Sequence, residues 1–152
     1  MILLTRTAYI GHNMADTMTP QRRSKLMSKI RGRGNYSTEL RLAKLLKEEG
    51  ITGWRRHLKL LGRPDFAFLK QRVFIFVDGD FWHGNPRTYK PPKSNTKFWL
   101  QKVKYNRKRD REISRHLKDK GWKVLRVWES DLRRKPSRCL ARIIRVLKIP
   151  LV

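Results

Sequence analysis

A long helix followed at once by an apolar strand is the feature that most limits how this chain can fold. The segment from about Thr96 to Lys120 has an apolar face formed by Val103, Ile113 and Leu117, and Gly121 stops it. The next segment, WKVLRVW (122–128), is rich in β-branched and aromatic residues and is predicted to be a strand. Because a helical crossover returns the chain in the same direction, this strand is expected to lie parallel to its neighbour.

A β-hairpin is predicted upstream of this helix. The segment GRPDFAFLK (62–70) contains a turn and then a strand, Gln71 lies in the hairpin turn, and RVFIFV (72–77) returns as a buried strand. GWRRHLKL (53–60) is predicted to be a further strand. An antiparallel hairpin and a parallel crossover in one sheet make that sheet mixed.

Helices and loops complete the predicted order. Thr-Pro starts a helix over 19–30, and RGRGN (31–35) breaks it. Ser37 caps a second helix that Gly50 ends, residues 84–95 form a proline-containing loop, and 137–148 form a closing helix. The predicted fold is an α/β sandwich around a mixed sheet, with one domain over 19–152 and a flexible extension over 1–18. Met14 and Met18 are alternative starts.

The charge of the chain points to a polyanionic partner. Its 152 residues include 38 Lys and Arg against 12 Asp and Glu, a net charge of +26. Nucleic acid is the favoured partner, because the rival, an anionic membrane, calls for a long amphipathic helix that the sequence lacks. Cys139 is the only cysteine, which excludes an internal disulfide and a zinc site of several cysteines. With no membrane span or signal-peptide pattern, the expected location is the cytoplasm, in association with the nucleoid.

Carboxylates and a histidine gather around the segment IFVDGDFWHG (75–84). Asp65 starts one strand of the hairpin and Asp78 ends the other, so both are expected at the same end of the sheet. With His83 as a base and Glu39 holding water, these residues would suit phosphodiester hydrolysis with Mg²⁺. The structural alternatives are turn residues for Asp65 and Asp78, a polar residue near a core for His83, and a helix-dipole partner for Glu39.

Aromatic residues surround the same segment. Phe81 and Trp82 are either a plug over the end of the sheet or a wedge that enters a base stack. Trp99, Lys102 and Asn106 share one face of the helix 96–120 and are predicted to contact base edges. As a wedge, Phe81, Trp82 and Trp99 are expected to be exposed when DNA is absent.

Four ordered motifs together resemble the very-short-patch-repair (Vsr) DNA mismatch endonucleases. They are RRSKLMSKIRGRGNYSTELRLAKLL, GRPDFAF, VDGDFWHG and FWLQKVKYNRKRDREISRHLKDKGWKVLRVWES. The resemblance extends from about Thr19 to about Leu132. It implies a restriction-endonuclease-like three-layer fold and a Mg²⁺-dependent nick beside a T·G mismatch in double-stranded DNA. The protein is expected to act on DNA as a monomer.

The resemblance also implies roles for individual residues. Asp65 and the carbonyl of Val77 would bind the metal, His83 would be the catalytic histidine, and Glu39 would hold metal-bound water. Asp78 occupies a catalytic position that is His or Asp in relatives. The implied DNA contacts are Phe81, Trp82 and Trp99 as intercalating aromatics, Lys102 and Asn106 at the mismatch, and Met27 in the minor groove.

One departure from the family concerns a structural zinc. Members usually hold zinc with Cys and His near this turn and after the last strand. The corresponding positions here are Asp80, Asn85, Arg87 or Thr88, and Ser130, which cannot form that site. No structural zinc is therefore expected, and both the order of the 84–95 loop and strict T·G specificity are open.

Two other functions compete with mismatch nicking. The same nuclease core occurs in homing or mobile-element endonucleases, which cut a specific site without a mismatch. A non-catalytic DNA-binding protein with this fold is the second alternative, and the intact set of Glu39, Asp65 and His83 argues against it.

Overall fold

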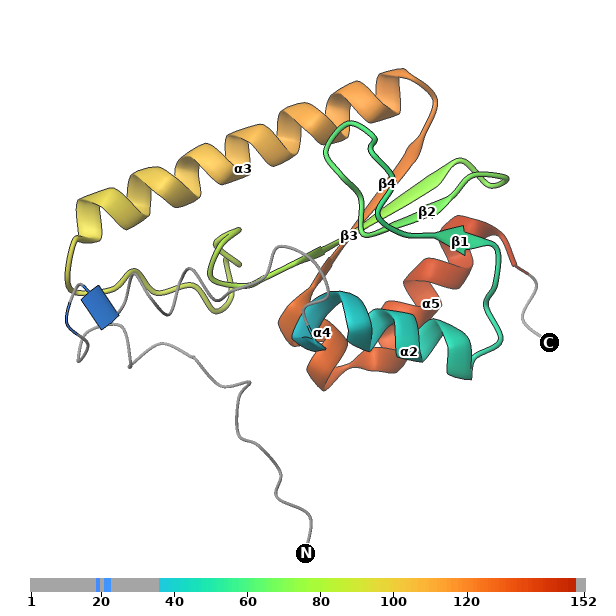
Figure 1. The fold of residues 1–152 in the computed structure, drawn as a ribbon, viewed down its shortest axis with the longest axis horizontal. Helices are drawn as coiled ribbons and strands as arrows, with labels where there is room; N and C mark the ends of the chain where they lie inside the picture. The colour runs from blue at the N-terminus through green and yellow to red at the C-terminus, as the bar shows by residue number, and fades with distance from the viewer. Residues whose placement is uncertain (1–18, 20, 23–35, 150–152) are drawn as a thin grey trace, which may run out of the picture.

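Residues 19, 21–22 and 36–149 are described by the computed structural model of the chain, shown in Figure 1. The predicted extension 1–18, most of the predicted helix 19–30 and Met27 lie outside these residues. At the start of that helix, Thr19 Oγ1 accepts a hydrogen bond from the backbone N–H of Arg22 at 3.3 Å, as an N-cap residue does.

A four-stranded mixed sheet forms the centre of the described structure. The strands are β1 (Trp54–Arg55), β2 (Phe66–Phe68), β3 (Val73–Asp78) and β4 (Lys123–Trp128), and they lie in the order β1-β2-β3-β4. β2 and β3 pair antiparallel as the predicted hairpin, with Phe66 opposite Ile75. β3 and β4 pair in parallel, with Asp78 opposite Trp128, which confirms the predicted crossover.

Helices cover both faces of this sheet (Figure 1). The helical elements are η1, a π-helical turn over Tyr36–Leu40; α2, Arg41–Glu48; α3, Thr96–Asp119; α4, Glu129–Arg134; and α5, Pro136–Leu147. The long helix α3 lies on one side of the sheet, and α2, α4 and α5 lie on the other. The fold is therefore the expected α/β three-layer arrangement.

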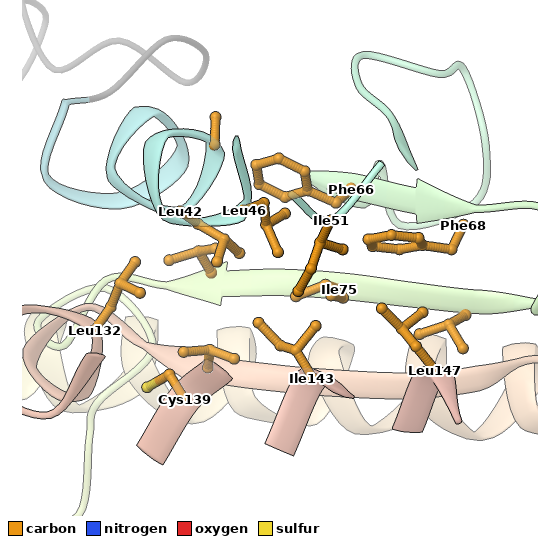
Figure 2. Packing of buried hydrophobic residues seen from close by; sticks show 14 residues of the cluster. Leu42, Leu46, Ile51, Phe66, Phe68, Ile75, Leu132, Cys139, Ile143 and Leu147 are labelled. Carbon is orange, nitrogen blue, oxygen red and sulfur yellow. The ribbon is translucent and has the colours of Figure 1, made fainter. Parts of the chain in front are cut away.

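The larger hydrophobic core lies between the sheet and α2, α4 and α5 (Figure 2). Successive side chains of a strand point to opposite faces, so Val73, Ile75 and Val77 face this core. Leu42, Leu46, Phe66, Leu132 and Ile143 are fully buried in it. Full burial of one such side chain stabilises the fold by roughly 1.5–3 kcal/mol.

A smaller core lies between the sheet and α3. It contains Phe74, Phe76 and Leu117, and the ring of Phe74 stacks on Trp122 with centroids 4.1 Å apart. The predicted apolar face of α3 is confirmed, since Val103 and Leu117 are buried and Ile113 packs against this cluster. Phe74, Phe76 and Asp78 are the β3 residues that face α3, and Asp78 is the charged one among them. It ends the strand and brings a carboxylate to the end of the sheet.

Two local predictions were wrong or incomplete, and one helix was missed. The strand expected over 53–60 is only two residues long, because β2 offers a short edge and His57 has a positive φ of 59° that ends the extended backbone. The helix expected from Ser37 begins with the π-helical turn η1 before α2. The helix α4 was not expected at all. Among the described residues, no helix combines the length and apolar character needed to cross a membrane.

Candidate active site

Asp65 and β3 are joined at the end of the sheet. Asp65 Oδ2 accepts a hydrogen bond from the backbone N–H of Val77 at 2.7 Å. The backbone N–H of Asp65 donates a hydrogen bond to the carbonyl oxygen of Ile75 at 3.1 Å. Val77 lies beyond the last residue of β3 that pairs with β2. Because a strand residue directs its N–H and C=O to the same side, the Val77 carbonyl faces the side on which Asp65 lies.

The environment of Asp65 disfavours a negative charge. Burial raises the pKa of this carboxyl from its ordinary 3.8 to about 6, and the nearby charges of Glu39 and Asp78 act in the same direction. The Val77 hydrogen bond and the charge of Arg126 oppose the rise. A carboxylate in such a site is relieved by a bound cation, which fits a metal ligand.

His83 is held by a carboxylate that the sequence analysis did not single out. Its Nδ1 lies 2.5 Å from Asp110 Oδ2, on α3, and 3.7 Å from Asp78 Oδ1. Burial alone would raise the pKa of Asp110, but the hydrogen bond and charge of His83, with Arg126 and Arg109, lower it below its ordinary value. Asp110 is therefore an ionised partner that orients the His83 ring.

Asp78 is engaged by an arginine. Arg126 of β4 donates to its carboxylate from Nε and from Nη2, each at 2.6 Å. Burial alone would lower the pKa of Arg126, but Asp78 and Asp110 raise it above its ordinary value, so Arg126 is always charged. The structure thus brings Asp65, Asp78 and His83 to one end of the sheet, as predicted, and adds Asp110 and Arg126.

Glu39 also lies near this end of the sheet, in η1. It is 4% exposed, and its Oε1 accepts hydrogen bonds from Arg56 Nε at 2.8 Å and Nη2 at 2.5 Å. His57 Nε2 is 3.3 Å from the same oxygen. Glu39 contributes to the raised pKa of Asp65, which places its charge within electrostatic reach of the proposed metal ligand.

The turn that carries His83 is fastened to α3 by its backbone carbonyls. Asn106 Nδ2 donates to the carbonyl of Trp82 at 2.7 Å, and Arg107 donates to the carbonyls of His83 and Gly84. Gly84 has a φ of 61°, and a Cβ built on it would overlap the Val103 side chain. Helix α3 therefore fixes the turn at close range.

The expected exposure of Trp99 was wrong, and the face of α3 that carries Trp99, Lys102 and Asn106 is mostly buried. Asn106 and Trp99 are each 7% exposed, because they lie on the face of α3 that packs inward, and only Lys102 is exposed. The expected exposure of Phe81 and Trp82 was also wrong, since both are half-buried. Their rings contact each other and Trp99, with centroids 5.1–5.9 Å apart in edge-to-face geometry.

Similarity to known proteins identifies the family of this chain. The family model described as DNA mismatch endonuclease Vsr matches residues 15–88, which include Glu39, Asp65 and His83. The chain is 36% identical over 130 residues to the type II nicking enzyme V.NmeDIP of Neisseria meningitidis serogroup C, covering 84% of this chain and 87% of the relative. This chain belongs to the Vsr family.

Two further relatives agree with this assignment. The DNA mismatch endonuclease Vsr of Escherichia coli (strain K12) is 41% identical over 121 residues, which cover 79% of this chain and 77% of the relative. The type II nicking enzyme V.HpaIIP of Haemophilus parainfluenzae is 34% identical over 126 residues, covering 81% of this chain and 89% of the relative. The Vsr family is a family of DNA endonucleases.

At the positions where Vsr proteins were expected to hold zinc, this chain has a hydrogen-bonded polar network. Asp80 accepts hydrogen bonds from the backbone N–H of Ser130 at 2.9 Å, from Ser130 Oγ at 2.7 Å and from Asn85 Nδ2. Thr88 Oγ1 lies 3.4 Å from Asp80, and Asn85 is fully buried. These hydrogen bonds join the turn after β3 to the start of α4.

The donor atoms near the sheet end suit a hard cation. Within the described residues, no three His, Cys, Asp or Glu side chains form a group that could hold a metal ion. Mg²⁺ does not require such a group, because one or two carboxylates with carbonyl, phosphate and water oxygens complete its coordination. Asp65 and the Val77 carbonyl offer that kind of partial oxygen set.

Proposed function

We propose that this Vsr-family chain is a Mg²⁺-dependent endonuclease that nicks one strand of double-stranded DNA beside a T·G mismatch. The observation that carries this proposal is the arrangement of Asp65, His83 and Asp110 at one end of the sheet, in a chain of this family. A carboxylate with a raised pKa and a histidine held by a second carboxylate are the parts that phosphodiester hydrolysis needs.

Asp65 and the Val77 carbonyl are the proposed ligands of Mg²⁺. The fit comes from their hard oxygen atoms and from the raised pKa of Asp65, which a bound cation would relieve. Bound Mg²⁺ would supply Lewis-acid stabilisation of charge on the phosphate. Glu39, held by Arg56 and His57, is the proposed acidic residue that orients water near this site.

His83 is the proposed general base. In the neutral tautomer that donates from Nδ1 to Asp110, the lone pair is on Nε2. Nε2 would take the proton of an attacking water as its oxygen bonds to phosphorus. The bond from phosphorus to the leaving sugar oxygen then breaks. Asp110 holds the ring and favours the imidazolium that forms, as the carboxylate of a hydrolase triad does.

The basic surface supplies affinity for the DNA backbone. The net charge is +26, and α3 presents a series of exposed cations. They include Lys97, Lys102, Lys104, Lys108, Arg109 and Arg111. Such contacts bind phosphates without regard to sequence, so binding should weaken steeply with salt. A DNA-acting enzyme of this kind would work as a monomer in the cytoplasm, at the nucleoid.

Phe81, Trp82 and Trp99 are the proposed intercalating residues, and Lys102 and Asn106 the proposed mismatch contacts. Met27 is the proposed minor-groove contact. One observation favours an alternative, a homing or mobile-element endonuclease that cuts a matched site. Asn106 and Trp99 are buried, Asn106 is hydrogen-bonded to the Trp82 carbonyl, and Trp99 packs against Phe81 and Trp82. Mismatch recognition therefore requires this aromatic cluster to open when DNA binds.

The test uses duplexes whose flanking bases are randomised, because the recognised sequence is unknown. One pool carries a central T·G pair and its control carries T·A in the same random context. Each pool is incubated with the protein with Mg²⁺ or with EDTA, and nicked strands are sequenced. The expected result is a Mg²⁺-dependent nick in one strand of the T·G pool only.

Other outcomes separate the alternatives. Equal cleavage of both pools at one motif would identify a site-specific endonuclease that ignores the mismatch. Binding without cleavage under Mg²⁺ would show a DNA-binding protein that has lost catalysis. His83→Gln should abolish or strongly reduce the nick, which ties the activity to this site.

A further inference from the structure

Arg126 is a charged residue in the middle of an apolar strand. It lies in KVLRVW of β4, opposite Phe76 of β3, and its guanidinium is 4.7 Å from the centroid of the Phe76 ring. Because side chains alternate along a strand, Arg126 points to the face of the sheet that α3 covers. A half-buried guanidinium needs hydrogen-bonded partners, and those partners are residues of the candidate active site.

The guanidinium binds two carboxylates from two different elements. Nε and Nη2 donate to the two oxygens of Asp78 at 2.6 Å each, a bidentate pair. Nη2 is also 3.2 Å from Asp110 Oδ1 on α3. Arg126 thereby links β3, β4 and α3 at a single point.

The two carboxylates that Arg126 binds are also the two that face His83. Nδ1 of His83 is 2.5 Å from Asp110 Oδ2 and 3.7 Å from Asp78 Oδ1. The hydrogen bond therefore goes to Asp110, although a second acceptor lies little more than 1 Å farther away. What differs between them is that both oxygens of Asp78 are engaged by the guanidinium.

Without the guanidinium, Asp78 would be a buried carboxylate that lacks a partner. Its side chain is 6% exposed, so water cannot replace the two lost hydrogen bonds. An unsatisfied buried charge is strongly unfavourable, and His83 Nδ1 is a donor 3.7 Å from Asp78 Oδ1. Asp78 would then compete with Asp110 for His83 and turn the ring away from its present orientation.

We infer that Arg126 is a positioning residue that occupies Asp78 and so reserves His83 for Asp110. The inference rests on the proposed function, in which His83 Nε2 acts on water. By donating two hydrogen bonds to Asp78, Arg126 determines which carboxylate orients the proposed base His83. Asp78 is the partner that makes Arg126 necessary.

The kinetic test compares Arg126→Met with the double variant Asp78→Asn/Arg126→Met. Single-turnover nicking of the T·G duplex reports the chemical step, and the duplex Kd is measured separately. Loss of an oriented base should lower the nicking rate of Arg126→Met about 100-fold while the Kd changes by less than about threefold. Adding Asp78→Asn should then raise the rate about tenfold, because the competing carboxylate is replaced by an uncharged amide, whose oxygen is a weaker acceptor for the His83 N–H.

A rate for Arg126→Met equal to the wild-type rate would overturn the inference, and so would a double variant slower than the single one. Arg145→Met is the matched control, because it removes an exposed cation from α5, on the opposite side of the sheet. Where Arg126→Met does not fold, Arg126→Lys is tested instead. This variant keeps the positive charge but cannot donate two hydrogen bonds in the planar geometry of a guanidinium. Its expected loss is about tenfold, again relieved by Asp78→Asn, and an unchanged rate would contradict the proposal.

A second readout does not depend on cleavage. The imidazole resonances of His83 are observed in metal-free protein labelled with ¹⁵N at histidine, and assigned with His83→Gln. The Nδ1–H resonance should shift in Arg126→Met and return toward its wild-type position in the double variant. The same resonance in all three proteins would overturn the inference. A wild-type chain that nicks no duplex would instead refute the proposed function, and this measurement would still decide the role of Arg126.

Discussion

Asn106 Nδ2 donates a hydrogen bond to the carbonyl oxygen of Trp82 at 2.7 Å, from a side chain that is 7% exposed. The amide that the sequence suggested for a DNA base edge is thus already bonded to the turn that carries His83. In the absence of DNA this residue stabilises the active site, and any contact with a mismatch requires the bond to break first.

Asn106→Ala should therefore destabilise the protein. It leaves the Trp82 carbonyl without its donor, which costs about 1–3 kcal/mol when the group is buried. Lys102→Ala, one turn earlier and exposed, is the matched control and should change the free energy of unfolding by less than about 0.5 kcal/mol. Denaturant unfolding of both variants checks this, and equal stabilities for the two would show that the bond contributes nothing.

Asp65→Ala should abolish nicking and leave DNA binding nearly intact. The change removes the proposed metal carboxylate, whereas the Lys and Arg residues that bind phosphates remain. Cleavage with Mg²⁺ and a gel-shift titration of the same duplex measure the two effects. Nicking close to the wild-type rate would refute the metal assignment.

Asp65→Asn should stabilise the metal-free fold at neutral pH. Because the pKa of Asp65 is about 6 when folded and 3.8 ordinarily, the protonated carboxyl favours the folded state, and this contribution is lost as the pH rises through about 6. Asn resembles the protonated form and can still accept the Val77 hydrogen bond. The variant should be more stable than wild type at pH 7.5 by up to roughly 3 kcal/mol, with the difference vanishing toward pH 4.

Thermal melts in EDTA across that pH range test the relationship. The sign of the stability difference between Asp65→Asn and the wild type is the informative result. Loss of an ordinary, ion-paired carboxylate would instead make the variant less stable at neutral pH. A variant less stable than wild type at pH 7.5 would show that Asp65 is satisfied in the metal-free protein.

The purified protein should contain no stoichiometric zinc. Asp80, Asn85 and Ser130 bond to one another where the family was expected to place that metal. Elemental analysis after purification without a His tag, and melts with and without EDTA, provide the check. One zinc per chain, or a large loss of stability in EDTA, would contradict the expectation.

Trp82→Ala should reduce the preference for mismatched over matched duplex more than it reduces general DNA affinity. A wedge that unstacks a base step costs a few kcal/mol, and less where a mismatch has already weakened the stack. Fluorescence of the wild-type protein should also change more with mismatched duplex. If the variant unfolds while its folded fraction keeps the preference, then Phe81 and Trp82 are a core plug.

The sheet and α3 were predictable because their signals are local. The apolar run ending at Val77, the turn near Gln71 and the stop at Gly121 each fix an element without tertiary information. The short length of strand β1 was not predictable. The sequence pattern of 53–60 suits a longer strand, but the short β2 pairs with only two of these residues. The length of β1 depends on the strand it pairs with, and that partner cannot be read from the sequence.

The site was predictable in its conspicuous residues and not in their partners. Asp65, Asp78 and His83 stand beside glycine, proline or aromatic residues that mark a turn. Asp110 is hidden in the charged run NRKRDRE, and its inward position follows only from its spacing of one helical turn after Asn106. The signal for Arg126 was a charge inside an apolar strand. The exposure of Trp99 was misjudged, because its ring packs against Phe81 and Trp82 of the turn. Asn106 is buried on the same face, where the Trp82 carbonyl accepts its hydrogen bond.

The inward face of α3 also limits how the length of this chain can vary. Trp99, Val103, Asn106 and Asp110 follow one another at steps of three and four residues, and each meets a fixed partner in the turn. One inserted residue within this stretch would rotate everything after it by roughly 100° about the helix axis. Insertions between Trp99 and Asp110 should therefore be absent from functional relatives, whereas residues 90–95, which lie beyond the part of their loop that is hydrogen-bonded to the turn after β3, can change in number between them.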